Sequence, residues 1–119
     1  MSLPAEIAAG VRAFNARDYF DAHEHWEDHW GHGSPAERSA TLGLIKAAVA
    51  LHHLERANIA GFQWQAEQSL SHLRDNAAVW PQLQLVDLAE ALDSLLAQIR
   101  FLRDTIPSHW ERPTLPTLP

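Results

Sequence analysis

The stretch LGLIKAAVALHHL, residues 42–54, decides the fold of this chain. On a helix of about 3.6 residues per turn, its apolar side chains point to nearly every side, and His52 and His53 lie near its carboxyl end. A helix that is apolar nearly all round is surrounded by other elements and does not lie on a surface. The stretch therefore predicts a central, buried helix.

The residues just before this stretch indicate where the central helix begins. Ser34-Pro35-Ala36-Glu37 is a capping box with proline at the first helical position. The segment Gly31-His32-Gly33 ends the helix before it, because two glycines so close together stop a helix. A connection this short favours antiparallel packing of the two helices.

The helix that precedes this connection has an unusual composition. Residues 19–30 read YFDAHEHWEDHW, with three histidines, two tryptophans and four acids, and Asp18 is expected to cap them. One stripe of the helix is apolar, and we expect both of its tryptophans, Trp26 and Trp30, to lie in the core. His23 and Glu27, four residues apart, share the edge of that stripe.

Further helices are expected on both sides. The first runs from about Leu3 to Asn15, with Ser2 as its cap, and a fourth is capped by Asn58. A fifth is expected from Leu85 to Ile106, ended by Pro107.

A weak internal echo accompanies this pattern. Asn15-x-x-Asp18-Tyr19 is similar to Asn58-x-x-Gly61-Phe62, and the two segments are spaced by 43 positions. Helix-pair repeats can have such a period, and the few matching residues leave a true repeat open.

These patterns together predict an all-α protein, a single compact bundle of about five helices with a central buried helix. The helical domain is expected to span residues 1–107, and residues 108–119 are expected to form a proline-rich tail, extended or disordered. Hydrophobic residues at 46% and charged residues at 20% are typical of a soluble globular domain.

Composition also limits the partners. The formal charge is −6, from 9 basic and 15 acidic residues, so the chain would repel a nucleic acid and an anionic membrane surface. No apolar run approaches the roughly 20 residues that span a bilayer, and the absence of cysteine excludes disulfides and thiolate chemistry. We expect a cytoplasmic protein with neither nucleic acid nor membrane as a partner.

The order of the polar motifs resembles a known family. The motif residues read Phe14-Asn15-x-x-Asp18-Tyr19-Phe20-Asp21-Ala22-His23-Glu24-x-x-Glu27-x-x-Trp30, then Gly43-Leu44-Ile45-x-Ala47-x-x-Ala50-Leu51-His52 and Asn58-x-x-Gly61. Over residues 10 to 75 this is similar to the bacterial-type helical family known as domain of unknown function 309. The resemblance implies an all-α fold and no particular activity. The family's polar motif residues correspond to His23, Glu24, Glu27, Trp30 and His52.

Three of these residues have the chemistry of a divalent-metal site. The imidazoles of His23 and His52 and the carboxylate of Glu27 are ligands that zinc, manganese or iron accept. Glu24 would then act as a general base on metal-bound water, giving a small hydrolase-like or redox site. The register of the helices is the difficulty: if Trp30 faces Pro35, His23 faces about Leu42, roughly 15 Å short of His52 along the axis.

Other interpretations of the same residues stay open. His23 and Glu27 can form a polar network that only fixes helix packing, or a metal-free pocket for an unknown small molecule. The protein would then be a non-enzymatic binding or scaffold module, which includes a homodimer formed through Trp64 and Phe101, each off its own helix's apolar stripe. The sequence names no reaction and so leaves open whether the protein is an enzyme.

Overall fold

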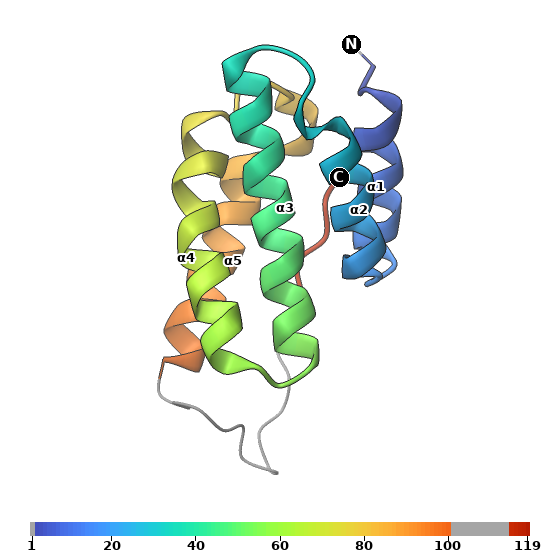
Figure 1. The fold of residues 1–119 in the computed structure, drawn as a ribbon. Coiled ribbons are helices and arrows are strands. Elements are labelled where there is room, and N and C mark those ends of the chain that lie inside the picture. The colour runs from blue at the N-terminus through green and yellow to red at the C-terminus, as the bar shows by residue number, and fades with distance from the viewer. Residues whose placement is uncertain (1, 101–114) are drawn as a thin grey trace.

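The computed structural model describes residues 2–100 and 115–119, and all of its regular structure in these ranges is helical. The predicted all-α fold is therefore confirmed (Figure 1). The elements, in order, are α1 Ala5–Asn15, α2 Tyr19–Trp30, α3 Pro35–Glu55, α4 Ile59–Asp75, a 3-10 turn η1 Pro81–Leu83, and α5 Leu85–Ile99. The part of the fifth helix predicted beyond Arg100 lies outside the described residues.

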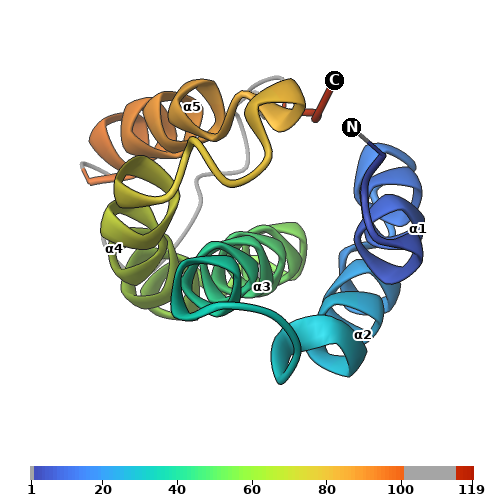
Figure 2. The ribbon, with the colours of Figure 1, turned by 90° about the horizontal axis from the view of Figure 1, so that it is seen from above.

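Helix α3 lies at the centre, as the sequence predicted. Seen from above, α2 and α4 lie on either side of it, and α1 and α5 lie beyond them (Figure 2). Ala47 and Leu51 are fully buried, in keeping with a helix that is apolar nearly all round. No helix in the described ranges is both long enough and apolar enough to cross a membrane.

The side chains that begin three of the helices were predicted correctly. Asp18 accepts a hydrogen bond from the Asp21 N–H, and Asn58 accepts one from the Gly61 N–H. Ser34 and Glu37 form the reciprocal capping box at the start of α3. The expected Ser2 cap is wrong: α1 begins at Ala5, directly after Pro4, and no side chain makes a capping hydrogen bond at its start. Pro4 itself occupies the cap position, with φ of −54° and ψ of 146°, and its side chain has no hydrogen-bond acceptor, so the helix starts without such a cap.

The turns α1–α2 and α3–α4 have the same backbone geometry. Arg17 and Ala57 both adopt left-handed backbone angles, with φ of 63° and 59°. In each turn the N–H of the next residue, Asp18 or Asn58, donates to the carbonyl five residues back, at 2.9 and 2.8 Å. The two turns therefore correspond at an offset of 40 positions, from 17 to 57, and not at the 43 suggested by the sequence echo.

The helices follow one another round a curve, which leaves α1 and α5 at its two ends (Figure 2). The carboxyl end, residues 115–119, lies between α1 and η1 in this view. Its Leu118 is only 4% exposed and belongs to the hydrophobic core. The described part of the predicted tail thus has no regular secondary structure and packs against the bundle.

Candidate functional site

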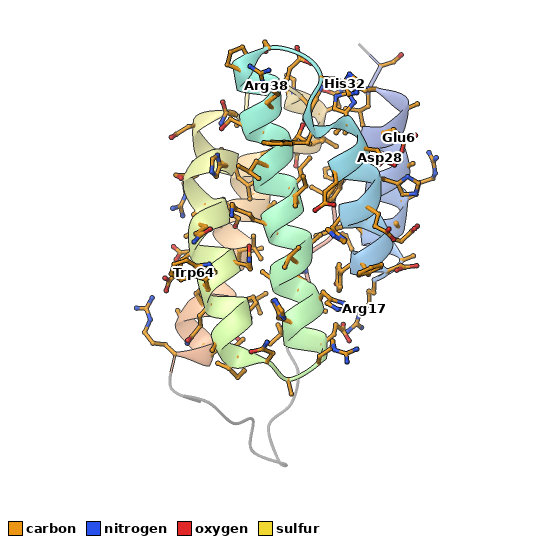
Figure 3. All side chains as sticks on the ribbon, viewed as in Figure 1. Glu6, Arg17, Asp28, His32, Arg38 and Trp64 are labelled. Carbon is orange, nitrogen blue, oxygen red and sulfur yellow. The ribbon has the colours of Figure 1, made fainter. Side chains whose placement is uncertain are left out.

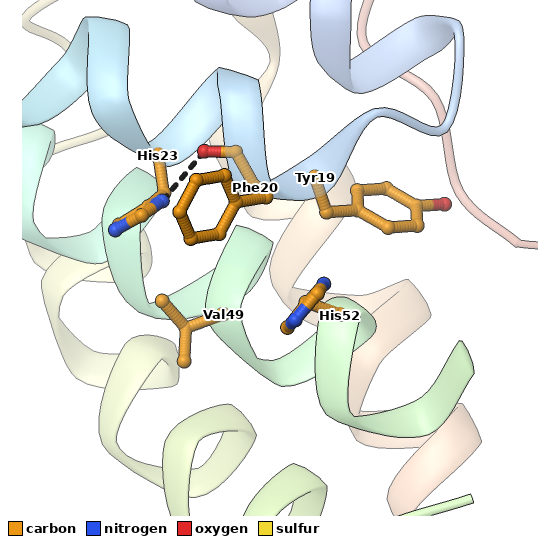
Figure 4. A pocket seen from close by; sticks show the side chains of 5 residues that line it. All are labelled: Tyr19, Phe20, His23, Val49 and His52. Atoms are coloured by element: carbon orange, nitrogen blue, oxygen red, sulfur yellow. Dashed lines mark hydrogen bonds between the residues drawn. The ribbon is translucent and has the colours of Figure 1, made fainter. Parts of the chain in front are cut away.

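A pocket of about 160 Å³ lies between α2 and α3 (Figure 4). Its walls are formed by Tyr19, Phe20, His23, Val49 and His52. The helical period explains the convergence: Tyr19 and His23 are one turn apart on α2, and Val49 and His52 are one turn apart on α3. The structure therefore brings together two of the three residues that the sequence suggested as metal ligands.

The ring of His23 is held in one orientation. Its Nδ1 lies 2.6 Å from the carbonyl oxygen of Phe20, and because a carbonyl only accepts, Nδ1 carries a proton and donates it. Its Nε2 lies 3.5 Å from Oε1 of Glu27. The Glu27 side chain is 57% exposed, so this second contact lies at the outer edge of the site.

His52 is the second polar group in the pocket. Burial lowers the pKa of His52, and the nearby basic groups of Arg56, His53 and His23 lower this pKa further. Since the ordinary histidine pKa is about 6.5, His52 is mainly neutral at pH 7. It can therefore present either a donor or an acceptor to a ligand.

Phe20 separates the two imidazoles. Its ring centroid lies 5.0 Å from that of His23 and 6.0 Å from that of His52, and its side chain is 54% exposed. Sequence reasoning assigned Phe20 no role in the site. A signal was present in its position three residues before His23 on the same helix, but contact with α3 depends on the register of packing.

That register differs from the one expected. His23 shares the pocket with Val49, seven residues further along α3 than Leu42, which corresponds to about 10 Å. In Figure 1 the chain leaving α2 rises to reach the start of α3, so the first turns of α3 project beyond the end of α2. The assumption that Trp30 faces Pro35 is therefore wrong, and the correction moves His52 towards His23.

The remaining predicted residues lie outside the pocket walls. Glu24 is exposed and does not line the pocket, and Glu27 reaches it only through His23. Within residues 2–100 and 115–119, no group of three or more histidine or acidic side chains is placed to hold a metal ion. The metal assignment of His23, Glu27 and His52 and the catalytic role of Glu24 stay predictions.

The other histidines of α2 have different surroundings. His25 Nδ1 lies 2.9 Å from Glu6 on α1, and its Nε2 lies 3.4 Å from Asp21, an arrangement that raises the pKa of His25. His29 packs near His32 and Trp80, with ring centroids 5.8 and 6.2 Å apart. His25 thus links α1 to α2.

The two tryptophans of α2 also differ. Trp26 is buried, and its indole N–H donates to the carbonyl of Ile7 across the α1–α2 contact. The prediction that Trp30 lies in the core is wrong, because α2 ends at this residue and the following turn is exposed, leaving its side chain 47% exposed.

Trp64, which the sequence suggested for a dimer contact, is 64% exposed on α4 (Figure 3). Its proposed companion Phe101 lies outside the described residues, and the homodimer stays a prediction.

One polar network was missed altogether. His72 Nδ1 lies 2.9 Å from the hydroxyl of Ser39, and Asn76 donates to the same hydroxyl at 2.8 Å. The Ser39 hydroxyl can accept from Asn76 and still bond to His72, and the network joins α3 to α4. No spacing rule reveals a contact between residues 33 positions apart on different helices.

Comparison with known proteins agrees with the resemblance noted in the sequence. The model of the family described as Domain of unknown function (DUF309) matches residues 7–64, a segment that contains every pocket residue. A segment of 46 residues is 46% identical to "Uncharacterized protein YpuF" of Bacillus subtilis (strain 168), covering 38% of this chain. The match spans 26% of that relative's length. No solved structure gives a significant match.

Proposed function

We propose a function from the pocket itself, because the description of the family whose model matches residues 7–64 names no activity: the protein binds a small organic anion with an apolar body. The observation that carries this proposal is His52, an imidazole at the wall of a largely apolar pocket, whose pKa is lowered by burial and by the nearby basic groups. We propose a binding module and assign no catalytic step.

The size of the pocket limits the ligand. An engineered cavity of roughly 150 Å³ in another protein holds one benzene molecule. The pocket between α2 and α3, at about 160 Å³, has room for one aromatic ring or a branched aliphatic group of similar size. The rings of Tyr19 and Phe20 and the methyl groups of Val49 supply apolar walls for it.

The charge around His52 favours an anion. The groups that lower its pKa through their charge, Arg56, His53 and His23, are all basic, in a chain whose formal charge is −6. A carboxylate beside His52 would offset this positive field and accept a charge-assisted hydrogen bond from the protonated ring. Binding of the anion should therefore raise the pKa of His52, and His52 should take up a proton from solution.

Sodium benzoate is the probe that tests this proposal, with benzyl alcohol and benzamidine as neutral and cationic probes of similar size. We expect benzoate to bind best and its affinity to increase as the pH falls from 8 to 6, measured by calorimetry and by the imidazole signals in NMR spectra. The His52→Leu variant keeps an apolar wall but should lose roughly tenfold or more in affinity, the cost of a charged hydrogen bond. The matched control His32→Leu changes an exposed histidine in the turn after α2 and should bind as the wild type does. Equal binding of the three probes, or unchanged benzoate binding in His52→Leu, would refute the proposal.

A divalent metal is the second candidate, and the orientation of His23 favours it. Ligating histidines commonly donate their other N–H to a backbone carbonyl, as Nδ1 does here to Phe20, and Nε2 faces a carboxylate oxygen of Glu27. His52 would become a third ligand once the Phe20 ring rotates away, and Glu24 would be left to act as a base.

Elemental analysis of untagged protein, dialysed after supplementation with zinc, manganese or iron, tests this candidate. We expect one bound metal per chain, lost in His23→Ala and in His52→Ala, and tighter binding in Phe20→Ala because that variant removes the ring between the two imidazoles. Protein that retains no stoichiometric metal in either the wild type or Phe20→Ala would leave His23 and Glu27 with a structural role.

A further inference from the structure

The side chain of Asn15 bonds to the carboxyl-terminal residues 115–119 and helps to hold them against the bundle. Asn15, the last residue of α1, donates from Nδ2 to the Leu118 carbonyl, and its Oδ1 accepts from the Leu118 N–H, both at 2.8 Å. The two bonds go to one residue, whose N–H and C=O point to the same side when the backbone is extended. The carboxamide of Asn15 therefore takes the place of a neighbouring strand.

This form of recognition selects a backbone conformation and one side chain. Both hydrogen bonds are to main-chain atoms, so they require an extended residue that is not proline. The leucine side chain is then selected by burial, since Leu118 is 4% exposed and packs into the core of the bundle. The site thus accepts an extended segment with leucine at its centre.

The tail carries the same three residues twice. Residues 114–116 and 117–119 both read Thr-Leu-Pro. Leu115 is partly buried against the same core as Leu118, as expected for an extended proline-rich chain with about three residues per turn. A repeated motif of this kind is typical of peptides recognised in an extended conformation.

The tail does not fill the space beside it. A pocket of about 370 Å³ lies between residues 116–119 and the segment formed by η1 and the first turns of α5. Leu83, Gln84 and Asp87 line it on the helical side. A peptide with larger side chains beside its leucine could therefore place them in this pocket, which the tail does not fill.

We propose that the groove between the end of α1 and the η1–α5 segment is a binding site for extended peptides of the Leu-Pro type, and that the chain's own carboxyl-terminal segment occupies it as a built-in competitor. The groove is distinct from the α2–α3 pocket, and it shares no residue with the walls of that pocket. A partner peptide must displace Leu118 before it binds to Asn15.

The test uses the full-length chain and a fluorescently labelled peptide with the sequence of residues 113–119, followed by fluorescence anisotropy. In the wild type the tethered tail competes at an effective concentration in the millimolar range, so the added peptide should bind weakly. In Leu118→Ser the tail loses its buried anchor, and we expect the peptide to bind at least tenfold more tightly. Adding Asn15→Ala to this variant removes both backbone hydrogen bonds and should reverse the gain by about tenfold or more.

Controls separate recognition from loss of folding. The same peptide with serine in place of the leucine that matches Leu118 should not bind to any variant, and circular dichroism should show unchanged helicity, because Asn15→Ala introduces a good helix former. Should Leu118→Ser unfold, the wild type serves instead. Excess unlabelled peptide must then shift the Leu118 amide signal of the isotope-labelled chain towards its position in the unbound tail.

Three results would overturn the proposal. The first is a folded Leu118→Ser variant that does not bind the peptide. The second is binding that does not change when Asn15 is replaced. The third is a wild-type dimer in sedimentation that Leu118→Ser abolishes, because the groove of each copy would then hold the tail of the other.

Discussion

At the residue scale, two histidines with shifted pKa values make the stability of the fold depend on pH in opposite directions. The hydrogen bond to Glu6 raises the pKa of His25, whereas burial lowers that of His52. His25 therefore stabilises the fold at pH values below the unfolded histidine pKa, about 6.5, and this contribution is lost as the pH rises through the folded pKa. His52 destabilises the fold as the pH falls below about 6.5, because the unfolded chain then binds the proton more readily.

The His25→Gln variant isolates the first effect. We expect it to lower the free energy of unfolding more at pH 6 than at pH 9, since only protonated His25 gains from Glu6 and Asp21. The difference should be small, at most about 1 kcal/mol, because all three side chains are partly exposed. Urea unfolding at the two pH values measures it, with His32→Gln as the matched control. An equal loss at both pH values would mean that the contact contributes by packing alone.

Some roles of single residues were accessible from the sequence and others were not. Caps such as Asp18 and Asn58, and the i,i+4 pair of His23 and Glu27, depend only on neighbours along one helix, so their spacing identifies them. The position of Phe20 between two imidazoles depends on how far α2 slides along α3. Because that displacement is set by the connecting turn and the packing of many side chains, it could not be predicted.

At the element scale, the turn after α3 holds Ala57 in a backbone conformation that is unfavourable for alanine. In the left-handed region, contact between the Cβ atom and the backbone raises the conformational free energy of an L-residue by roughly 1 kcal/mol. Glycine has no Cβ atom and avoids this cost. Ala57 has φ of 59° and an exposed side chain, so replacing it removes no buried contact. The corresponding Arg17 differs because its guanidinium pairs with Glu55.

We therefore expect Ala57→Gly to raise the free energy of unfolding by about 0.5 kcal/mol, after part of the gain is offset by the greater freedom of glycine in the unfolded chain. The matched control is Ala97→Gly at an exposed helical position of α5, which should lower stability by about 0.5–1 kcal/mol. Thermal and urea unfolding of both variants give the comparison. A loss of stability in Ala57→Gly similar to that of the control would contradict the strain at this turn.

At the scale of the whole molecule, the all-round apolarity of residues 42–54 was enough to predict the central helix. The curved arrangement of the five helices could not be predicted in the same way. An apolar stripe on one side of a helix shows that this side is buried, but it does not show which helix covers it. The contact of Asn15 with Leu118 joins residues 103 positions apart, and the tail that makes it has no helical period. Proline-rich composition predicted a tail that is extended or disordered, and it carried no information on what residues 115–119 touch.

The contact between Asn15 and Leu118 also bears on the order in which the protein folds. The turns after α1 and α3 close contacts between residues only a few positions apart, so each helix pair can form early. Closing a loop of 103 residues costs about 4 kcal/mol of chain entropy in the simplest polymer model, unless the helices between have already formed. The bond to Leu118 should therefore be the last part of the native structure to form. By the same reasoning it should be the first to open in local fluctuations, and its amide proton should exchange with solvent sooner than those of α3.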